Sequence, residues 1–104
     1  MLDDTFVVLA EPTRRRILNE LRTADSSVGE LVDALGVRQP TVSKHLKVLR
    51  RAGFVSSRVA AQRRIYRIEP GQFQILDGWL EPYRQLWSRH FDALERHLDS
   101  EEQR

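Results

Sequence analysis

One stretch of the chain carries side chains suited to binding a polyanion. Residues 38–67 contain no Asp or Glu and nine Lys or Arg residues, which are Arg38, Lys44, Lys47, Arg50, Arg51, Arg58, Arg63, Arg64 and Arg67. Ammonium and guanidinium groups form charge-assisted hydrogen bonds with phosphate oxygens. Such a block is either a nucleic-acid footprint or an unusually basic solvated face, and the order of its residues separates the two.

The first part of this block has the periodicity of a helix that begins near Pro40. Val42, Leu46 and Leu49 recur at i, i+4 and i+7, so they form an apolar stripe that must be buried. Hydroxyls reach base edges in a DNA major groove, and cations neutralise phosphates. Gly53 stands where the helix would end. The face opposite to the apolar stripe carries a hydroxyl together with cations, which favours the nucleic-acid interpretation. This face consists of Pro40, Ser43, Lys44, Lys47 and Arg51.

Two short runs rich in β-branched and aromatic residues follow, at residues 54–59 and 63–68. They predict a β-hairpin joined around Ala60, Ala61 and Gln62. The tip lacks the Asn-Gly or Asp-Gly pair of a tight turn, which leaves the loop length open. A basic hairpin directly after a basic helix is the layout of a winged helix-turn-helix. In that layout the helix enters the major groove and the hairpin, or wing, reaches the backbone or the minor groove.

The residues before this block predict three helices. Residues 3–10 form a short helix with Phe6, Val7 and Leu9 available for packing, and residues 12–22 form a helix that buries Ile17, Leu18 and Leu21. Ser27 and Glu30 have the spacing of a capping box. They begin a helix with an apolar i, i+3, i+4, i+7 pattern that Gly36 closes, and this completes a helix-turn-helix: Val28, Leu31, Val32 and Leu35.

A long amphipathic stretch begins at Gln72. Its apolar residues are spaced by three or four positions, as on a helix: Phe73, Leu76, Leu80, Tyr83, Trp87, Phe91, Leu94 and Leu98. Pro82 predicts either two helices or one helix with a kink between Gly78 and Pro82. On a small domain, a stripe with this many aromatic side chains must be shielded from water by another apolar surface. That surface is either a second copy of the chain or the chain's own core.

Charge and composition narrow the class of protein. Residues 13–67 carry 13 basic and four acidic residues, giving +9, whereas the flanks carry four basic and 11 acidic residues, giving −7 and a total of +2. The absence of cysteine excludes disulfides and thiolate metal sites. No apolar run is long enough to span a membrane, and no basic segment precedes a long apolar stretch at the N-terminus. We therefore expect one soluble, cytoplasmic domain.

The sequence QPTVSKHLKVLRRAGFV, followed by a basic hairpin ending in YRI, resembles the ArsR-type (ArsR/SmtB) transcriptional regulators. AEPTRRRILNEL resembles the second helix of that family. The resemblance implies a mainly α fold with a small β-hairpin, a winged helix-turn-helix that dimerises through terminal helices. Residues 1–104 would be one DNA-binding domain, with the winged-helix core at about 6–68 and a dimerisation region at about 72–100.

The resemblance also assigns site residues. It implies DNA contact by residues of the helix and the wing: Gln39, Thr41, Ser43, Lys44, His45, Lys47, Arg58, Arg63 and Arg64. For His45 an interfacial role satisfied by the backbone is the alternative, and Tyr66 is expected to belong to the packing of the wing. Similar regulators pair the last helix across a two-fold axis, which implies a homodimer through Leu76, Leu80, Tyr83, Trp87, Phe91, Leu94 and Leu98.

These features predict a regulator that binds double-stranded DNA at a palindromic operator as a homodimer and represses transcription. Activation remains an alternative to repression. The rival from another class is a winged-helix protein-interaction module whose basic face docks an acidic partner. The exposed Gln39, Thr41 and Ser43 argue against it, because an electrostatic dock does not need them.

We expect neither a metal nor any other cofactor. Where similar regulators carry thiol ligands, SSVGEL places Ser27 and Gly29. At a second family site Asp77 and His90 are present, but Trp79 and Ala93 replace the other two ligands. A small organic effector among Trp79, Tyr83 and Trp87 is an alternative to these rings being dimer core. Since the chain has no Gly-rich phosphate loop and no cysteine nucleophile, we expect no enzyme.

Overall fold

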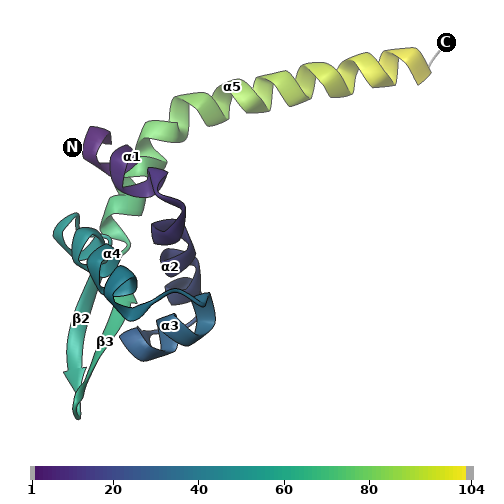
Figure 1. Cartoon of the computed structure of the whole chain (residues 1–104). Helices are drawn as coiled ribbons and strands as arrows, with labels where there is room; N and C mark the ends of the chain where they lie inside the picture. The colour runs from purple at the N-terminus through teal and green to yellow at the C-terminus, as the bar shows by residue number, and fades with distance from the viewer. Residues whose placement is uncertain (1, 103–104) are drawn as a thin grey trace.

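The computed structural model describes residues 2–102, so the first residue and the last two residues of the predicted domain lie outside it. Figure 1 shows helices gathered beside a hairpin, with one long helix running away from them. This mainly α winged helix-turn-helix confirms the predicted fold class. Its elements are, in order, α1 (Leu2–Ala10), α2 (Pro12–Thr23), β1 (Ser26–Ser27), α3 (Val28–Leu35), α4 (Gln39–Arg51), β2 (Val55–Ala60), β3 (Arg63–Ile68) and α5 (Gly71–Glu102).

The apolar core joins α2, α3 and α4 and closes on the base of the hairpin. The predicted stripes of α2 and α4 are buried, and in α3 Leu31 and Leu35 are buried while the other two residues of its stripe are half-buried. Phe54, directly before β2, is fully buried and forms a T-shaped ring pair with Phe73, with the centroids 5.2 Å apart. The core cluster consists of Val8, Ile17, Leu18, Leu21, Leu31, Leu35, Val42, Leu46, Leu49, Phe54 and Val55.

Helix α1 packs through a different face from the predicted one. Thr5 and Val8 are buried against α2 and α5, whereas Phe6 and Val7 are exposed. Thr5 and Val8 are three positions apart and so share one face of the helix. Val7 does not pack as predicted, because so short a helix has no clear apolar period, whereas Phe6, although partly exposed, meets the Trp79 ring at 5.2 Å between centroids. Leu9 packs at the edge of the core as expected.

The predicted capping box begins α3. The Ser27 hydroxyl oxygen accepts from the Glu30 amide at 3.2 Å, and the Ser27 amide donates to Glu30 Oε1 at 3.0 Å. Hydrogen bonds from the Ser27 amide and hydroxyl lower the pKa of the Glu30 carboxyl, and the Arg63 charge adds to this. Ser26 and Ser27 also form β1, which pairs with Tyr66 and Ile65 of β3. The sequence did not predict this strand, since two residues have no measurable alternation.

Replacing Ser27 with alanine is expected to lower the free energy of unfolding by about 1 kcal/mol, because the first turn of α3 loses its cap. The melting temperature followed by circular dichroism should fall by roughly 4–8 °C. Hydrogen bonds between Ser27 and the Glu30 carboxylate lower the pKa of Glu30 in the folded state. The stability that these bonds add is therefore present at neutral pH and is lost as Glu30 is protonated in acid. Ser88→Ala on the exposed surface of α5 is the control. An unchanged melting temperature for Ser27→Ala would contradict the cap.

The wing is a hairpin with β3 at the centre of a three-stranded antiparallel sheet, in the order β1-β3-β2. Ala60 pairs with Arg63, so the loop that the sequence left open has two residues, Ala61 and Gln62. Ala61 adopts a φ of 58°, in the left-handed region that hairpin turns require and that glycine usually occupies. The hairpin extends away from the helices, at the opposite end of the molecule from the end of α5 (Figure 1).

Helix α5 is one continuous helix, which excludes the alternative of two helices. Figure 1 shows that it changes direction beside α1, and Pro82 lies inside it. Proline cannot donate to the carbonyl of residue i−4, here Gly78, and its ring pushes that carbonyl aside. Arg84 joins the two sides of the bend, since it donates to the Asp77 carbonyl at 2.8 Å and to Glu81 Oε2 at 2.6 Å. The carboxylates of Glu81 and Asp77, Glu81 first, raise the pKa of Arg84.

Beyond the bend, α5 projects away from the winged-helix core. We call this part of the helix, from residue 83 onward, the arm. The molecule measures 68 × 29 × 22 Å and its radius of gyration is 19.3 Å, against about 13 Å for a compact chain of this length. The alternative that the apolar stripe covers the chain's own core is therefore wrong for the arm.

Candidate nucleic-acid interface

The turn between α3 and α4 presents α4 to solvent. Gly36 has a φ of 66°, and its amide donates to the Val32 carbonyl at 2.9 Å, which ends α3 with a left-handed residue. Arg38 caps α4 without a side-chain hydrogen bond, as expected from its side chain. Because one face of α4 is held in the core, its opposite face is exposed, and five of the predicted contact residues lie there: Gln39, Thr41, Ser43, Lys44 and Lys47.

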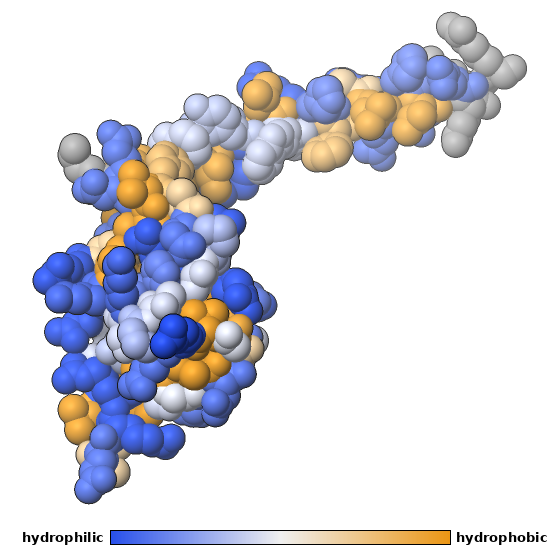
Figure 2. Space-filling model, viewed as in Figure 1, coloured by the Kyte–Doolittle hydropathy of each residue, from blue (hydrophilic) through white to orange (hydrophobic). Residues whose placement is uncertain are grey.

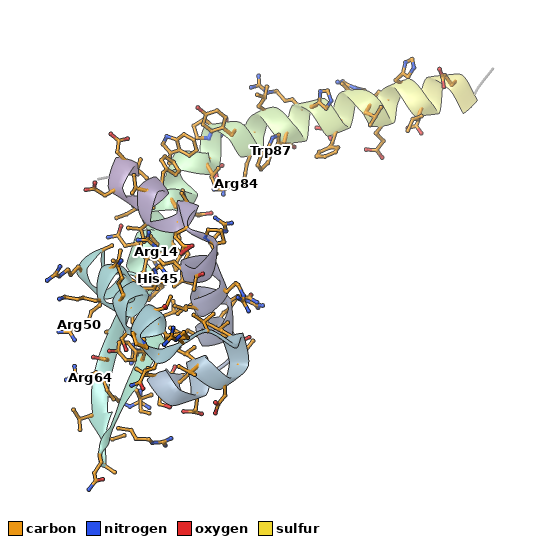
Figure 3. All side chains as sticks on the ribbon, viewed as in Figure 1. Arg14, His45, Arg50, Arg64, Arg84 and Trp87 are labelled. Atoms are coloured by element: carbon orange, nitrogen blue, oxygen red, sulfur yellow. The ribbon has the colours of Figure 1, made fainter. Side chains whose placement is uncertain are left out.

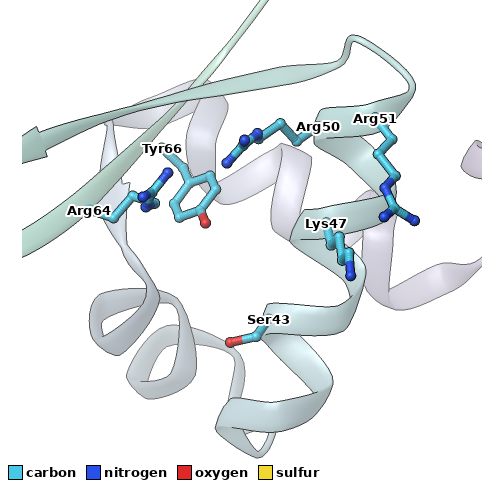
Figure 4. A pocket seen from close by; sticks show the side chains of 6 residues that line it. All are labelled: Ser43, Lys47, Arg50, Arg51, Arg64 and Tyr66. Atoms are coloured by element: carbon cyan, nitrogen blue, oxygen red, sulfur yellow. The ribbon is translucent and has the colours of Figure 1, made fainter.

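A basic hollow of about 460 Å³ separates α4 from the wing (Figure 4). We call it the basic groove. Figure 4 shows the Tyr66 ring between Arg64 and Arg50. Tyr66 also packs against the core cluster, as the sequence analysis expected. The groove is lined by Ser43, Lys47, Arg50, Arg51, Arg64 and Tyr66.

Two arginines of the basic groove were not assigned DNA contacts, although the sequence had placed Arg51 on the exposed face of the helix. Arg50 and Arg51 extend from the last turn of α4, three and four positions beyond Lys47, so they continue its row of cations. Figure 3 shows Arg50 and Arg64 on the same side of the molecule, away from the arm. The i, i+3 and i+4 spacing from Lys47 was the signal that would have identified both.

The cations of α4 are available for a ligand. Among residues 2–102, no carboxylate lies within ion-pair distance of Lys44, Lys47, Arg50 or Arg51. A cluster of unpaired cations repels itself and gains from an added polyanion. The groove is therefore electrostatically prepared for phosphate groups.

The wing arginines divide between the two faces of the hairpin. Side chains alternate along β3, so Arg64 and Tyr66 face the basic groove. Arg64 donates to the Ser57 hydroxyl at 3.2 Å and has no carboxylate partner among the described residues. Arg58 and Arg63 lie on the other face, where Arg58 pairs with Asp25 at 3.0 Å and Arg63 with Glu30 at 3.7 Å.

A second hollow, of about 500 Å³, lies between α3, the start of α4 and the tip of the wing. Gln39 and Arg63 line it together with the carboxylates of Glu30 and Asp33. These acidic groups oppose a phosphate, so this surface is electrostatically less favourable for DNA than the basic groove. Arg64 lines this hollow as well as the basic groove, so it borders both surfaces. Of the predicted contacts, Ser43, Lys47 and Arg64 line the basic groove, whereas Arg58 and Arg63 do not.

His45 is the predicted contact that is least exposed. Its side chain is 16% exposed, and its Nε2 lies 3.4 Å from Oε2 of Glu11, the residue that caps α2. Figure 3 places His45 within the helical cluster, away from the side chains of Arg50 and Arg64. The imidazole is thus an interfacial group, although its partner is a carboxylate and not the backbone alternative of the sequence analysis.

The arginines at the start of α2 serve the scaffold. Arg15 donates to the carbonyls of Leu9 and Ala10 at 2.8 and 3.0 Å, and Arg16 donates to the Leu35 carbonyl at 2.8 Å. Carbonyls at helix ends have no intrahelical partner, so these bonds satisfy the ends of α1 and α3. Neither arginine is free to act primarily as a phosphate contact.

The residues predicted to form a dimer interface fall into two groups. Leu76 and Leu80 are half-buried against the chain's own helices, whereas the five further along the arm are exposed: Tyr83 (45%), Trp87 (55%), Phe91 (66%), Leu94 (49%) and Leu98 (51%). Figure 2 shows their helix as a line of apolar patches, and the hairpin end as largely hydrophilic. Exposed Leu86 extends the stripe.

Of the aromatic residues considered for an organic effector, Trp79 and Tyr83 contact each other. Trp79 lies 4.9 Å from Tyr83 between ring centroids and forms a T-shaped pair with Phe6 at 5.2 Å. In the range 2–102 no cluster of three or more His, Cys, Asp or Glu side chains is arranged to hold a metal ion. None of the helices in that range has the length and apolar character needed to cross a membrane.

A helix-turn-helix whose second helix is exposed and is followed by a basic hairpin defines the winged helix-turn-helix class. A family model described as "Bacterial regulatory protein, arsR family" matches residues 11–57. The HTH-type transcriptional regulator Rv2034 of Mycobacterium tuberculosis is 37% identical over 99 residues, which cover 95% of this chain and 90% of that protein. The chain therefore belongs to the arsR family of transcriptional regulators, which confirms the resemblance seen in the sequence.

Two further comparisons agree. The HTH-type transcriptional repressor SmtB of Mycobacterium tuberculosis is 47% identical over 60 residues, covering 58% of this chain and 44% of that protein. The solved structure of an ArsR-like transcriptional regulator from Rhodococcus sp. RHA1 has a TM-score of 0.75 at 30% identity, covering 95% of this chain and 91% of that one. The family consists of DNA-binding regulators, so the protein is a DNA-binding transcriptional regulator and not an enzyme.

Proposed function

We propose that the protein represses transcription by binding a palindromic operator as a homodimer. The observation that carries this proposal is the exposed face of α4, where hydroxyl groups are flanked by unpaired cations and bordered by Arg64. Thr41 and Ser43 would read base edges in the major groove, and Lys44, Lys47 and the groove arginines would hold phosphates. Gln39 would contribute to base readout from the start of the helix.

The arm supports a dimer. An apolar stripe exposed from Tyr83 to Leu98, about four helical turns, is unfavourable in water, and pairing two arms would bury it. A two-fold axis through the arms would place two α4 helices on one side of a DNA duplex. Two such helices fit successive major grooves at about 34 Å, or a multiple of it, and the operator then has matching two-fold symmetry.

Repression is supported by the names of related proteins. SmtB of Mycobacterium tuberculosis and SdpR of Bacillus subtilis are both named transcriptional repressors, the latter at 27% identity over 79 residues. A dimer held on promoter DNA excludes other proteins from the same site, so occupancy alone suffices for repression.

Selection from a pool of duplexes with a randomised centre tests this function. The protein should enrich one inverted repeat with half-site centres about 10–10.5 base pairs apart, or a multiple of this. Failure to enrich any sequence would contradict the proposal. If the protein then bound an acidic protein in preference to DNA, the interaction-module alternative would replace it.

Arg64→Ala is expected to weaken binding to the selected duplex by roughly 10- to 100-fold, because each protomer loses one phosphate contact. The slope of log affinity against log salt concentration, measured by fluorescence anisotropy, should become shallower by about 0.9 per protomer. Arg58→Ala is the matched control, since it removes an arginine that faces Asp25 on the other face of the hairpin. Equal losses for both variants would contradict the division of the wing.

A further inference from the structure

The contact between His45 and Glu11 joins the DNA-facing helix to the junction of α1 and α2. Glu11 stands between these helices, 34 positions before His45, and its side chain is 32% exposed. This contact links the carboxylate that caps α2 to the helix that carries the base-reading side chains. Neither residue lines the basic groove.

Glu11 uses its two oxygens differently. Oε1 accepts from the Thr13 amide at 3.2 Å and so caps α2, whereas Oε2 is buried and has no hydrogen-bond partner among the described residues. His45 Nε2, at 3.4 Å, is the group placed to satisfy Oε2. A buried carboxylate oxygen without a partner is energetically costly. The position of α4 that keeps His45 beside this oxygen is therefore favoured over positions that move it away. Arg14, one turn further along α2, also has a buried Nε without a hydrogen-bond partner.

Apolar contacts alone fix α4 loosely along its axis. Val42, Leu46 and Leu49 hold it on the core, but apolar packing is non-directional and tolerates small shifts. Base readout does not tolerate them, because a hydrogen bond is lost within a few tenths of an ångström to 1 Å of displacement. A polar contact on the flank of α4 supplies the missing direction.

We propose that His45 is a positioning residue for DNA recognition: its contact with Glu11 sets the position of α4, and His45 itself does not touch DNA. This inference rests on the proposed function. It replaces the direct DNA contact that the sequence resemblance assigned to His45. The position of the exposed side chains of α4 depends on this contact. Thr41 and Ser43 should be affected most, because they lie within about one helical turn of His45.

A double-mutant cycle tests the proposal with the full chain and the duplex enriched by the wild-type protein. Glu11→Gln removes the charge but keeps an oxygen to accept from the Thr13 amide, and His45→Phe keeps a planar ring without a donor. Each variant should bind the selected duplex about tenfold more weakly, and the double variant should lose no more than either one. The salt slope should stay unchanged, because no phosphate contact is removed.

The conservative variant His45→Gln supplies the control. Its amide can donate to Glu11, so its affinity should return to within about threefold of the wild-type value, which a loss of the ring alone would not allow. Circular dichroism at the binding temperature verifies that each variant is folded.

Three results would overturn the proposal. A shallower salt slope for His45→Phe with no effect of Glu11→Gln would mean that His45 contacts DNA directly. Additive losses in the double variant would mean that the two residues act independently. Absence of any enriched duplex for the wild-type protein would overturn the proposed function and this inference with it. The first two results are distinct from this one, because both require a duplex that the wild-type protein binds.

Discussion

Replacing both Trp87 and Leu94 with aspartate is expected to convert the protein into monomers. The two side chains lie on the exposed stripe of the arm, and each is about half exposed in the single chain. If two arms pair, each aspartate would place a charge in an apolar interface without a partner, which is strongly unfavourable. Light scattering at micromolar concentration should then report the mass of one chain.

The same variant should lose operator affinity by about 10²- to 10⁴-fold. Binding of one half-site by a linked dimer makes binding of the second nearly intramolecular, and monomers lose that advantage. The control is Gln85→Asp with Arg89→Gln, which changes the net charge equally but lies on the opposite face of α5. A variant with Trp87 and Leu94 replaced that remained dimeric would contradict pairing through the arm.

Replacing Lys47 and Arg51 with alanine is expected to reduce DNA affinity by about 10³- to 10⁴-fold at 0.1 M salt. A dimer would lose four phosphate contacts, and each contact releases close to one counterion. The slope of log affinity against log salt concentration should become shallower by about 3.6 for the same reason. Selected and scrambled duplexes should be affected similarly, because phosphate contacts carry no sequence information.

The matched control for this pair is Arg22→Ala with Arg89→Ala. It removes the same formal charge from surfaces away from the basic groove, so it should change the slope little. Anisotropy titrations of both variants across several salt concentrations make the comparison. A normal slope for the variant lacking Lys47 and Arg51 would contradict the assignment of the basic groove to DNA.

Much of the fold could be predicted because apolar period and turn chemistry agree along the chain. The stripes of α2, α3 and α4 repeat at helical spacing, and the capping box at Ser27 marks a helix start that the structure confirms. The hairpin was predictable from its β-branched residues, and the unpaired cations of α4 lie on the face expected from the helical wheel. Local patterns suffice where one element decides its own conformation.

The remaining features depend on contacts between elements distant in sequence. Strand alternation places Arg58 and Arg63 on the face of the hairpin away from the basic groove, where they meet Asp25 and Glu30. A sequence pattern does not show which carboxylate a cation will meet. The burial of His45 depends on Glu11 in the same way. The direction of the arm depends on the bend at Pro82, whose position the sequence gives but whose angle is set by neighbouring side chains.

The central claim is that this protein recognises a specific DNA sequence through the exposed face of α4. The most direct test is a fluorescence-anisotropy titration of the wild-type protein against the selected duplex and a scrambled duplex of the same composition, at physiological salt. We expect a preference of about 10³-fold or more for the selected duplex, with two protomers bound to each duplex at saturation. Equal affinity for the two duplexes would contradict it.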